Sequence, residues 1–164
     1  DAIKISKKPV AISHANPLFF HKSKRNIEND VLKKLSNKNG FIGLSLYPYH
    51  LKNHSKCKIE DFCQMVKNLI NLIGVESIGI GSDLCSNWKD DVVVWMRNGK
   101  WTKQLDYGES KNKSNKWPDQ PKWFKKGSDI INIYNGLIKS GISEKNAVKI
   151  IGSNWLNFMK NTID

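Results

Sequence analysis

The sequence lacks the patterns that mark several common classes of protein. It has three cysteines in 164 residues and no Cys-x-x-Cys spacing, so neither a disulfide framework nor a structural zinc knuckle is expected. We interpret Cys57, Cys63 and Cys85 as buried or idle thiols. No apolar run approaches the roughly 18 residues that cross a membrane, and no charged-then-apolar leader follows Asp1. The sequence therefore predicts no membrane span in this segment and shows no targeting signal.

Acidic residues are scarce, with 15 Asp and Glu against 27 Lys and Arg and a formal net charge of +12. Such an excess can indicate a protein that binds nucleic acid or an acidic partner. The lysines are scattered along the chain, however, which is typical of a solvated surface. Gly79-Ile80-Gly81 lacks the third glycine of a phosphate loop, and no basic and aromatic strand platform accompanies the tryptophans. We therefore expect no nucleic-acid partner and keep a basic, non-catalytic binding module as an alternative.

Three short aliphatic segments have the composition of buried parallel strands, namely 9–13 (PVAIS), 41–47 (FIGLSLY) and 77–82 (SIGIGS). None alternates cleanly between apolar and polar residues, as expected for strands covered on both faces. Apolar residues at helical spacing predict helices between them, over 27–37 and 59–73. The order β-α-β-α-β is typical of a parallel α/β sheet or barrel.

Capping residues mark the expected helix ends. Asn26 is expected to cap the first helix, and Gly40 and Gly74 are expected to close the first and second. Beyond the third strand, further helices are predicted over 129–139 and from Ser143 to at least Gly152.

Residues 84–127 interrupt the alternation and are expected to form a long loop insertion. The insertion carries five of the six tryptophans and the polar run 108–116, which predicts an exposed loop. Loops of this length are usually functional or disordered, and the tryptophans favour an ordered lid or an interface. Three β/α units are too few for a closed barrel of about 250 residues. We therefore expect residues 1–164 to form one partial domain of a larger fold.

Polar side chains follow each predicted strand. His14 follows the first strand, Tyr47 ends the second, and Asp83 follows the third. Because functional groups gather at the carboxyl ends of parallel strands, we expect these side chains along one rim. A neutral histidine is the commonest transition-metal ligand, and a neighbouring aspartate can bind metal or carry protons. A structural histidine and a turn-forming aspartate are the alternatives.

Other polar residues carry weaker signals. His21, His50 and His54 form no His-x-Asp, His-x-His or His-Glu-x-x-His motif, so we expect them at the surface. Lys24-Arg25 is either a solvated pair or an anion clamp, since arginine binds carboxylates through two parallel hydrogen bonds.

Five strings, taken in order, resemble the renal (membrane) dipeptidase family, peptidase family M19. They are Pro9–Asn16 (PVAISHAN), Lys24–Leu32 (KRNIENDVL), Gly40–Pro48 (GFIGLSLYP), Gly74–Asp83 (GVESIGIGSD) and Gly141–Leu156 (GISEKNAVKIIGSNWL). The family's counterparts include PV-x-x-SHS, RN-x-x-D-x-x-L and G-x-x-H-V-G-I-G-S-D. The strings cover nearly the whole chain and are specific as a set. The resemblance implies an α/β fold, the C-terminal half of a (β/α)8 TIM-type barrel of the metallo-dependent hydrolases.

The resemblance also implies an activity, namely hydrolysis of dipeptides at two zinc ions bridged by water or hydroxide. It implies that His14 is a ligand of the second zinc, that Arg25 grips the terminal carboxylate of the substrate, and that Tyr47 lines the substrate site. Asp83 matches the catalytic aspartate that handles the proton of the attacking water. The family's other metal ligands belong to an N-terminal half, so we expect this chain to be inactive alone and the complete protein to be a homodimer.

Two points stay open at this stage. Leu84-Cys85-Ser86 follows Asp83 where many relatives have Phe-Asp-Gly, which puts the geometry of that loop in doubt. Another metal-dependent amidohydrolase on the same barrel, such as a deacetylase or lactonase, is the alternative, and Arg25 would discriminate between the two. The compartment is not fixed by the sequence, with a cytoplasmic or periplasmic bacterial protein favoured.

Overall fold

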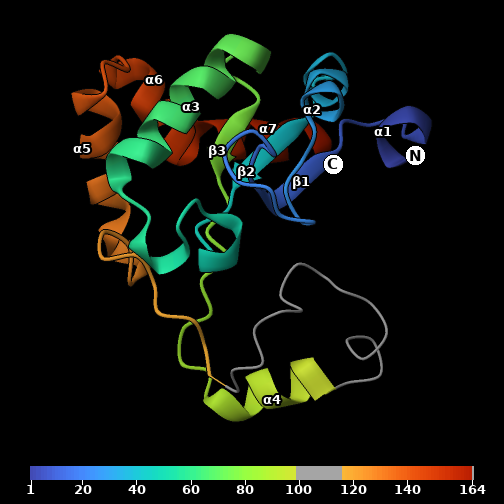
Figure 1. The fold of residues 1–164 in the computed structure, drawn as a ribbon. Coiled ribbons are helices and arrows are strands. Elements are labelled where there is room, and N and C mark those ends of the chain that lie inside the picture. Colours follow the sequence, from blue (N-terminus) through green and yellow to red (C-terminus); the bar gives the residue numbers. More distant parts are fainter. Residues whose placement is uncertain (99–115, 164) are drawn as a thin grey trace.

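The computed structural model describes residues 1–98 and 116–163, and its centre is a parallel sheet in the order β1-β2-β3 (Figure 1). The strands are β1 (Ala11–Ala15), β2 (Phe41–Leu44) and β3 (Ile78–Ile80). Helix α2 (Asn29–Ser36) connects β1 to β2, and α3 (Ile59–Ile73) connects β2 to β3. The structure therefore confirms the α/β class and the β-α-β-α-β order predicted from the sequence.

The remaining elements flank this unit. They are α1 (Ala2–Ile5), 3₁₀ turns at Pro48–His50, His54–Lys56 and Gly127–Asp129, α4 (Asp90–Asn98), α5 (Ile130–Lys139), α6 (Glu144–Val148), a π-helical turn at Lys149–Ser153, and α7 (Asn154–Thr162). Within the described ranges, no helix combines the length and apolar character needed to cross a bilayer.

One face of the sheet is buried beneath helices. Ile42, Leu44 and Ile78 on this face are inaccessible to solvent, as alternate residues of short strands should be when a helical layer covers them. The helices contribute apolar residues at helical spacing, namely Leu32, Leu35, Phe62, Val66, Leu69, Ile133 and Leu137. In Figure 1, α3 lies between the sheet and α5. This core holds the strands in place and so fixes the positions of their carboxyl ends.

On the opposite face of the sheet, Gly43 and Gly79 leave space for the indole of Trp155. A Cβ at Gly79 would lie 2.9 Å from a ring carbon of Trp155, so the indole packs there because glycine leaves the space. The Trp155 Nε1–H donates to the carbonyl of Ile80 at 2.7 Å. Its ring centroid lies 4.4 Å from that of Phe41. Helix α7 is thereby attached to β2 and β3.

Two helix ends differ from the sequence prediction. The N-cap of α2 is Glu28, not Asn26; Asn26 is buried and its side chain bonds to other loops instead. Gly40 does not adopt the left-handed conformation after α2, because Asn39 takes it with φ 54°. Asparagine tolerates this region better than other non-glycine residues. Gly74 does end α3, with φ 79°.

The segment after β3 contains more regular structure than a long loop. Helix α4 forms over Asp90–Asn98 and is set apart from the sheet in Figure 1. Trp88 and Trp95 are largely exposed, whereas the Trp123 indole packs 5.3 Å from the Phe62 ring and donates to the carbonyl of Cys57. The predicted exposed run 108–116 lies outside the described residues apart from its last member.

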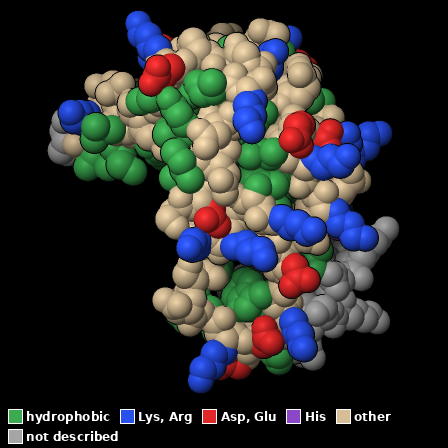
Figure 2. Space-filling model, turned by 90° about the vertical axis from the view of Figure 1, so that its left-hand side faces the viewer, with side chains coloured by type: hydrophobic (Ala, Val, Ile, Leu, Met, Phe, Trp, Pro, Cys, Tyr) green, Lys and Arg blue, Asp and Glu red, His purple; other side chains and the backbone are tan. Residues whose placement is uncertain are grey.

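Basic side chains are spread over the surface. On the face shown in Figure 2, Lys and Arg side chains lie among Asp, Glu and uncharged groups. Charges of both signs are therefore mixed on this face.

Candidate active site

An irregularity in β1 shapes the carboxyl edge of the sheet. Ile12 pairs with Ile42, but the next pair is Ala15 with Leu44, so β1 carries one residue more than β2 in this interval. Such a bulge redirects local side chains. The carbonyl of Ser13 is turned against the glycines at 43 and 81, where any Cβ would overlap it. The bulge and the two glycines that face it therefore set the position of the next residue, His14.

His14 and Arg25 are in direct contact. The Nε2 of His14 lies 3.2 Å from Nη2 of Arg25, and its Nδ1 lies 2.8 Å from Oγ of Ser13. Because a guanidinium only donates, Nε2 of His14 acts as the acceptor and Nδ1 of the neutral ring carries the proton toward Ser13. This tautomer presents the Nε2 lone pair at the edge of the sheet.

The loop that carries Arg25 is closed at its base. Ile27 N–H donates to the carbonyl of Asn16 at 2.8 Å, and Leu18 N–H donates to the carbonyl of Ile27 at 2.8 Å. The loop therefore leaves the end of β1 and returns beside it. Arg25 is exposed at the surface of this loop, where a ligand can reach its guanidinium.

Tyr47 and His50 pack together just past β2. Tyr47 is 5% exposed, and its ring centroid lies 5.2 Å from that of His50 and 5.6 Å from that of Tyr49. His50 is buried, with Nδ1 at 2.9 Å from Oγ of Ser45. Burial, together with the positive charge of Arg25, lowers the pKa of His50 to about 4. His50 is therefore neutral at neutral pH.

Asp83 ends the segment that continues β3. Its backbone is left-handed, with φ 54°, a conformation that aspartate accepts more readily than most residues. The preceding carbonyl, of Ser82, accepts a bond from Leu46 N–H at 3.2 Å, and Leu84 N–H donates to the Ser82 hydroxyl at 3.3 Å. Asp83 thus belongs to the edge that also carries Tyr47.

All four predicted site residues belong to the carboxyl edge of one parallel sheet. His14 and Arg25 touch, Tyr47 follows the central strand, and Asp83 follows the third strand. Their functional roles stay predictions. Among the described residues, no group of three or more His, Cys, Asp and Glu is placed to hold a metal ion. His14 fits a metal as a single ligand, because Nε2 is an acceptor, now bonded to Arg25, and Nδ1 is held by Ser13, as the second nitrogen is in protein metal sites.

The burial of Asn16, Asn26, Ser45 and His50 beneath this edge was not predicted from the sequence. His50 was expected at the surface but is 3% exposed. His54 is exposed, and the half-buried His21 stacks edge-on against it with ring centroids 5.4 Å apart. Burial and the nearby His54 lower the pKa of His21. The available signal for His50 was Ser45, a hydroxyl in an otherwise apolar strand, since buried hydroxyls require a partner.

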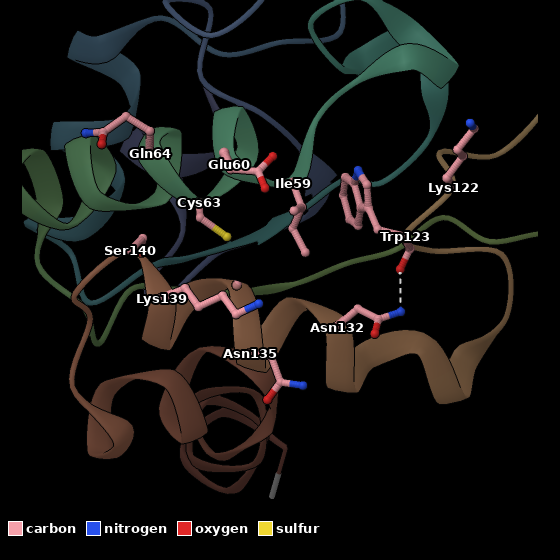
Figure 3. A pocket seen from close by; sticks show the side chains of 11 residues that line it. Ile59, Glu60, Cys63, Gln64, Lys122, Trp123, Asn132, Asn135, Lys139 and Ser140 are labelled. Carbon is pink, nitrogen blue, oxygen red and sulfur yellow. Dashed lines mark hydrogen bonds between the residues drawn. The ribbon is translucent and has the colours of Figure 1, made fainter.

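A separate cavity of about 630 Å³ opens between α3 and α5 (Figure 3). Trp123 and Ile59 form its walls, and Cys63 points into it from α3. Burial raises the pKa of the Cys63 thiol to about 12, so this thiol is not a nucleophile near neutral pH. None of the four predicted site residues lines the cavity, which is therefore distinct from the candidate active site.

Parallel strands joined by crossover helices define an α/β protein. In this class, ligands generally bind at the carboxyl edge of the strands. The sequence profile of the membrane dipeptidase family (Peptidase family M19) matches residues 1–90, which is more than half of the chain. The chain belongs to the membrane dipeptidase family.

Individual relatives agree with this assignment. Dipeptidase tcpJ of Claviceps purpurea is 24% identical over 165 residues, which span 100% of this chain and 32% of that protein. An uncharacterized dipeptidase of Schizosaccharomyces pombe is 28% identical over 85 residues, 51% of this chain and 20% of that protein. The chain thus spans a third or less of the length of these relatives.

Solved structures reproduce the fold. An amidohydrolase from Pseudomonas aeruginosa superposes with a TM-score of 0.81 at 26% identity, over 97% of this chain and 47% of that one. A metallo peptidase from Rhodobacter sphaeroides, liganded with a phosphinate mimic of the dipeptide L-Ala-D-Ala, superposes with a TM-score of 0.72 at 16% identity. That match covers 98% of this chain and 38% of the Rhodobacter chain.

Proposed function

We propose that the complete protein is a zinc-dependent dipeptidase and that this chain supplies the C-terminal half of its (β/α)8 barrel. The observation that carries the proposal is the contact between His14 and Arg25 at the carboxyl edge of the sheet, in a member of the membrane dipeptidase family. The contact places a metal-binding lone pair beside a carboxylate-binding guanidinium. A dipeptide presents a scissile carbonyl and a free carboxylate only one residue apart, which suits this spacing.

The chain contributes four side chains to the proposed reaction. Zinc, when bound, polarises the scissile carbonyl and lowers the pKa of water; Nε2 of His14 is the ligand offered here. Arg25 binds the terminal carboxylate of the substrate and so favours dipeptides over longer peptides whose carboxylate lies elsewhere. Asp83 accepts the proton of the attacking water and passes it to the leaving amine. Tyr47 lines the substrate side of the same edge.

The proposal assigns the rest of the active site to other parts of the protein. Zinc in catalytic sites takes about three protein ligands, and this chain offers one from its described residues. We therefore propose that the chain has no dipeptidase activity by itself. We also propose that the complete protein is a homodimer.

The proposal is tested with the full-length protein, reconstituted with zinc, on a dipeptide. Asp83→Asn should lower kcat by about a hundredfold or more, the range lost when a general acid–base group is removed. Asp61→Asn is the control. Asp61 lies on α3 and forms a partly exposed ion pair with Lys52, so its substitution should leave kcat unchanged. Equal turnover by Asp83→Asn and the parent protein would remove Asp83 from the mechanism.

A second candidate is another metal-dependent amidohydrolase reaction, since a similar solved structure is described as an amidohydrolase. The two candidates differ in what they require of Arg25. A dipeptidase should hydrolyse a dipeptide much faster than the C-terminal amide of the same dipeptide. Equal rates on the two substrates would favour the amidohydrolase alternative.

A further inference from the structure

A network of buried polar groups lies beneath the candidate active site. Asn16 and Ser45 have no solvent exposure, His50 is 3% exposed and Asn26 is 7% exposed. Burying so many polar groups is costly unless they bond to one another. Here the bonds join three separate pieces of chain: the end of β1, the loop that carries Arg25, and the segment after β2.

Asn26 is the centre of this network. Its Oδ1 accepts a bond from Asn16 N–H at 3.1 Å. Its Nδ2 donates to the carbonyls of His21 at 2.8 Å and His50 at 3.0 Å. The side chain thus connects the middle of its own loop to the residue that follows β1 and to the segment after β2.

Asn16 completes a closed circuit with Asn26. The Nδ2 of Asn16 donates to the carbonyls of Ser45 at 2.9 Å and His50 at 3.1 Å. The carbonyl of His50 therefore accepts bonds from both asparagines. Since Asn16 lies two residues after His14 and Asn26 lies one residue after Arg25, both functional residues are held relative to the same main-chain oxygen.

Arg25 itself has little local support. Its N–H bonds to the Ser23 hydroxyl at 3.3 Å, and its guanidinium contacts His14. A long, exposed side chain has considerable rotamer freedom, so its position depends on how firmly its backbone is held. The adjacent Asn26 supplies that support through its bonds to neighbouring segments.

We propose that Asn26 is a positioning residue that fixes the Arg25 guanidinium beside His14 and thereby sets the selectivity for substrates with a free carboxylate one residue from the scissile bond. This inference rests on the proposed dipeptidase function. Asn26 does not contact substrate in this scheme. It acts by keeping constant the separation between the group that binds the carboxylate and the group that holds the metal.

The chain provides a matched control in Asn154. Like Asn26, Asn154 is buried and donates two bonds from Nδ2 to main-chain carbonyls, those of Val75 at 2.7 Å and Ile78 at 2.8 Å. Both carbonyls lie at the amino-terminal end of β3, away from the carboxyl edge. Asn154→Leu should therefore cost stability as Asn26→Leu does, without moving Arg25.

The kinetic test uses the full-length protein with zinc, a dipeptide and its C-terminal amide. Asn26→Leu should raise KM for the dipeptide about tenfold or more while kcat changes little, because binding common to the ground and transition states is lost. KM for the amide should stay unchanged. Asn154→Leu should leave the ratio of the two KM values as in the parent protein. Equal effects of Asn26→Leu on both substrates would overturn the positioning role.

A structural test does not depend on turnover and so separates this inference from the proposed function. In a crystal structure of the zinc-free Asn26→Leu protein, His14 Nε2 and Arg25 Nη2 should be separated beyond hydrogen-bond distance, whereas zinc-free Asn154→Leu should keep them at about 3.2 Å. An unchanged contact in Asn26→Leu would overturn the inference even if the protein is a dipeptidase. Should the leucine variant fail to fold, Asn26→Asp keeps the acceptor for Asn16 N–H, loses both donated bonds, and should show the same separation.

Discussion

The Nε2 of His14 and the Nη2 of Arg25 lie 3.2 Å apart, with the imidazole as acceptor and the guanidinium as donor. A metal ion binds a neutral imidazole through the same kind of lone pair. In the proposed dipeptidase, Arg25 and zinc would therefore compete for Nε2, and zinc at Nε2 would release Arg25 to bind a carboxylate.

This competition gives a prediction about metal affinity. In the complete protein, His14→Ala should weaken one zinc site by about a hundredfold or more, at or beyond the range reported for changes around metal ligands. Arg25→Met should leave zinc affinity equal or higher, because both a competitor and a nearby positive charge are removed. Zinc content after dialysis against a chelator measures both. A parallel loss of zinc in the two variants would contradict the competition.

Substitution of Arg25 by lysine should also be costly. Lysine keeps the charge but lacks the planar fork that grips a carboxylate through two bonds. Loss of one charge-assisted bond, worth about 1.5–3 kcal/mol, predicts a ten- to hundredfold lower kcat/KM for a dipeptide. Lys22→Met, three residues earlier in the same loop, is the control and should change kcat/KM little. If Arg25→Lys has full activity, paired recognition of the carboxylate is wrong.

His50 should make stability depend on pH. Its pKa is about 4 in the folded protein against 6.5 for an ordinary histidine, so below pH 6.5 the unfolded chain binds a proton that the folded chain does not. Stability is therefore lost as pH falls from 6.5 toward 4. Between pH 7 and pH 5 this loss is about 2 kcal/mol. Urea unfolding of His50→Asn at these two pH values should show that much less pH dependence than the parent protein. An unchanged pH dependence would contradict the burial of a neutral His50.

Gly43 and Gly81, which face the Ser13 carbonyl at the β1 bulge, should tolerate no side chain. A Cβ at Gly81 would overlap the carbonyl of Ser13, which is backbone and cannot move aside cheaply. Gly81→Ala should destabilise the protein by about 1–3 kcal/mol or more, as overpacking does, and should displace His14 from its contact with Arg25. Gly152→Ala is the control, since its Cβ would meet nothing within 4 Å. Thermal unfolding compares the two variants. Equal melting temperatures would contradict the close approach of Gly81 to the Ser13 carbonyl.

The three thiols should differ sharply in reactivity. Cys57 and Cys63 are buried, and desolvation raises the pKa of each to about 12, whereas Cys85 is exposed. A thiol reagent at pH 8 should therefore label Cys85 rapidly and the other two only on unfolding. Cys85→Ser should abolish the rapid phase. Rapid labelling of more than one thiol in the folded protein would contradict the burial of the other two.

The sequence predicted the order of elements well because parallel strands and their crossover helices leave strong periodic signals. Ile42, Leu44 and Ile78 are found where such patterns place them. The rim residues also followed from a general rule about strand ends, without reference to side-chain contacts. Boundaries were less accurate: β1 begins two residues later than predicted, at Ala11, and extends through the bulge to Ala15, so that His14 lies within the strand.

The roles of Asn26 and His50 could not be predicted from the sequence, because they depend on tertiary hydrogen bonds. Asn26 was interpreted as a helix cap, which is what asparagine most often does before an apolar periodic run. Two of its partners, Asn16 and His50, lie 10 and 24 residues away in the chain, and no local pattern indicates contacts over such separations. His50 was expected at the surface because it belongs to no metal-binding motif. Its bond to Ser45, five residues earlier, forms only when the chain turns at Pro48–His50.

The attachment of α7 to β3 has a consequence for how the protein is made. Trp155 and Asn154 bond to carbonyls of residues that precede them by 75 to 79 positions. During translation, the strand leading to Asp83 leaves the ribosome long before these partners exist. The strand leading to Asp83 is therefore fully supported only after Asn154 and Trp155, the first residues of α7, have been synthesised.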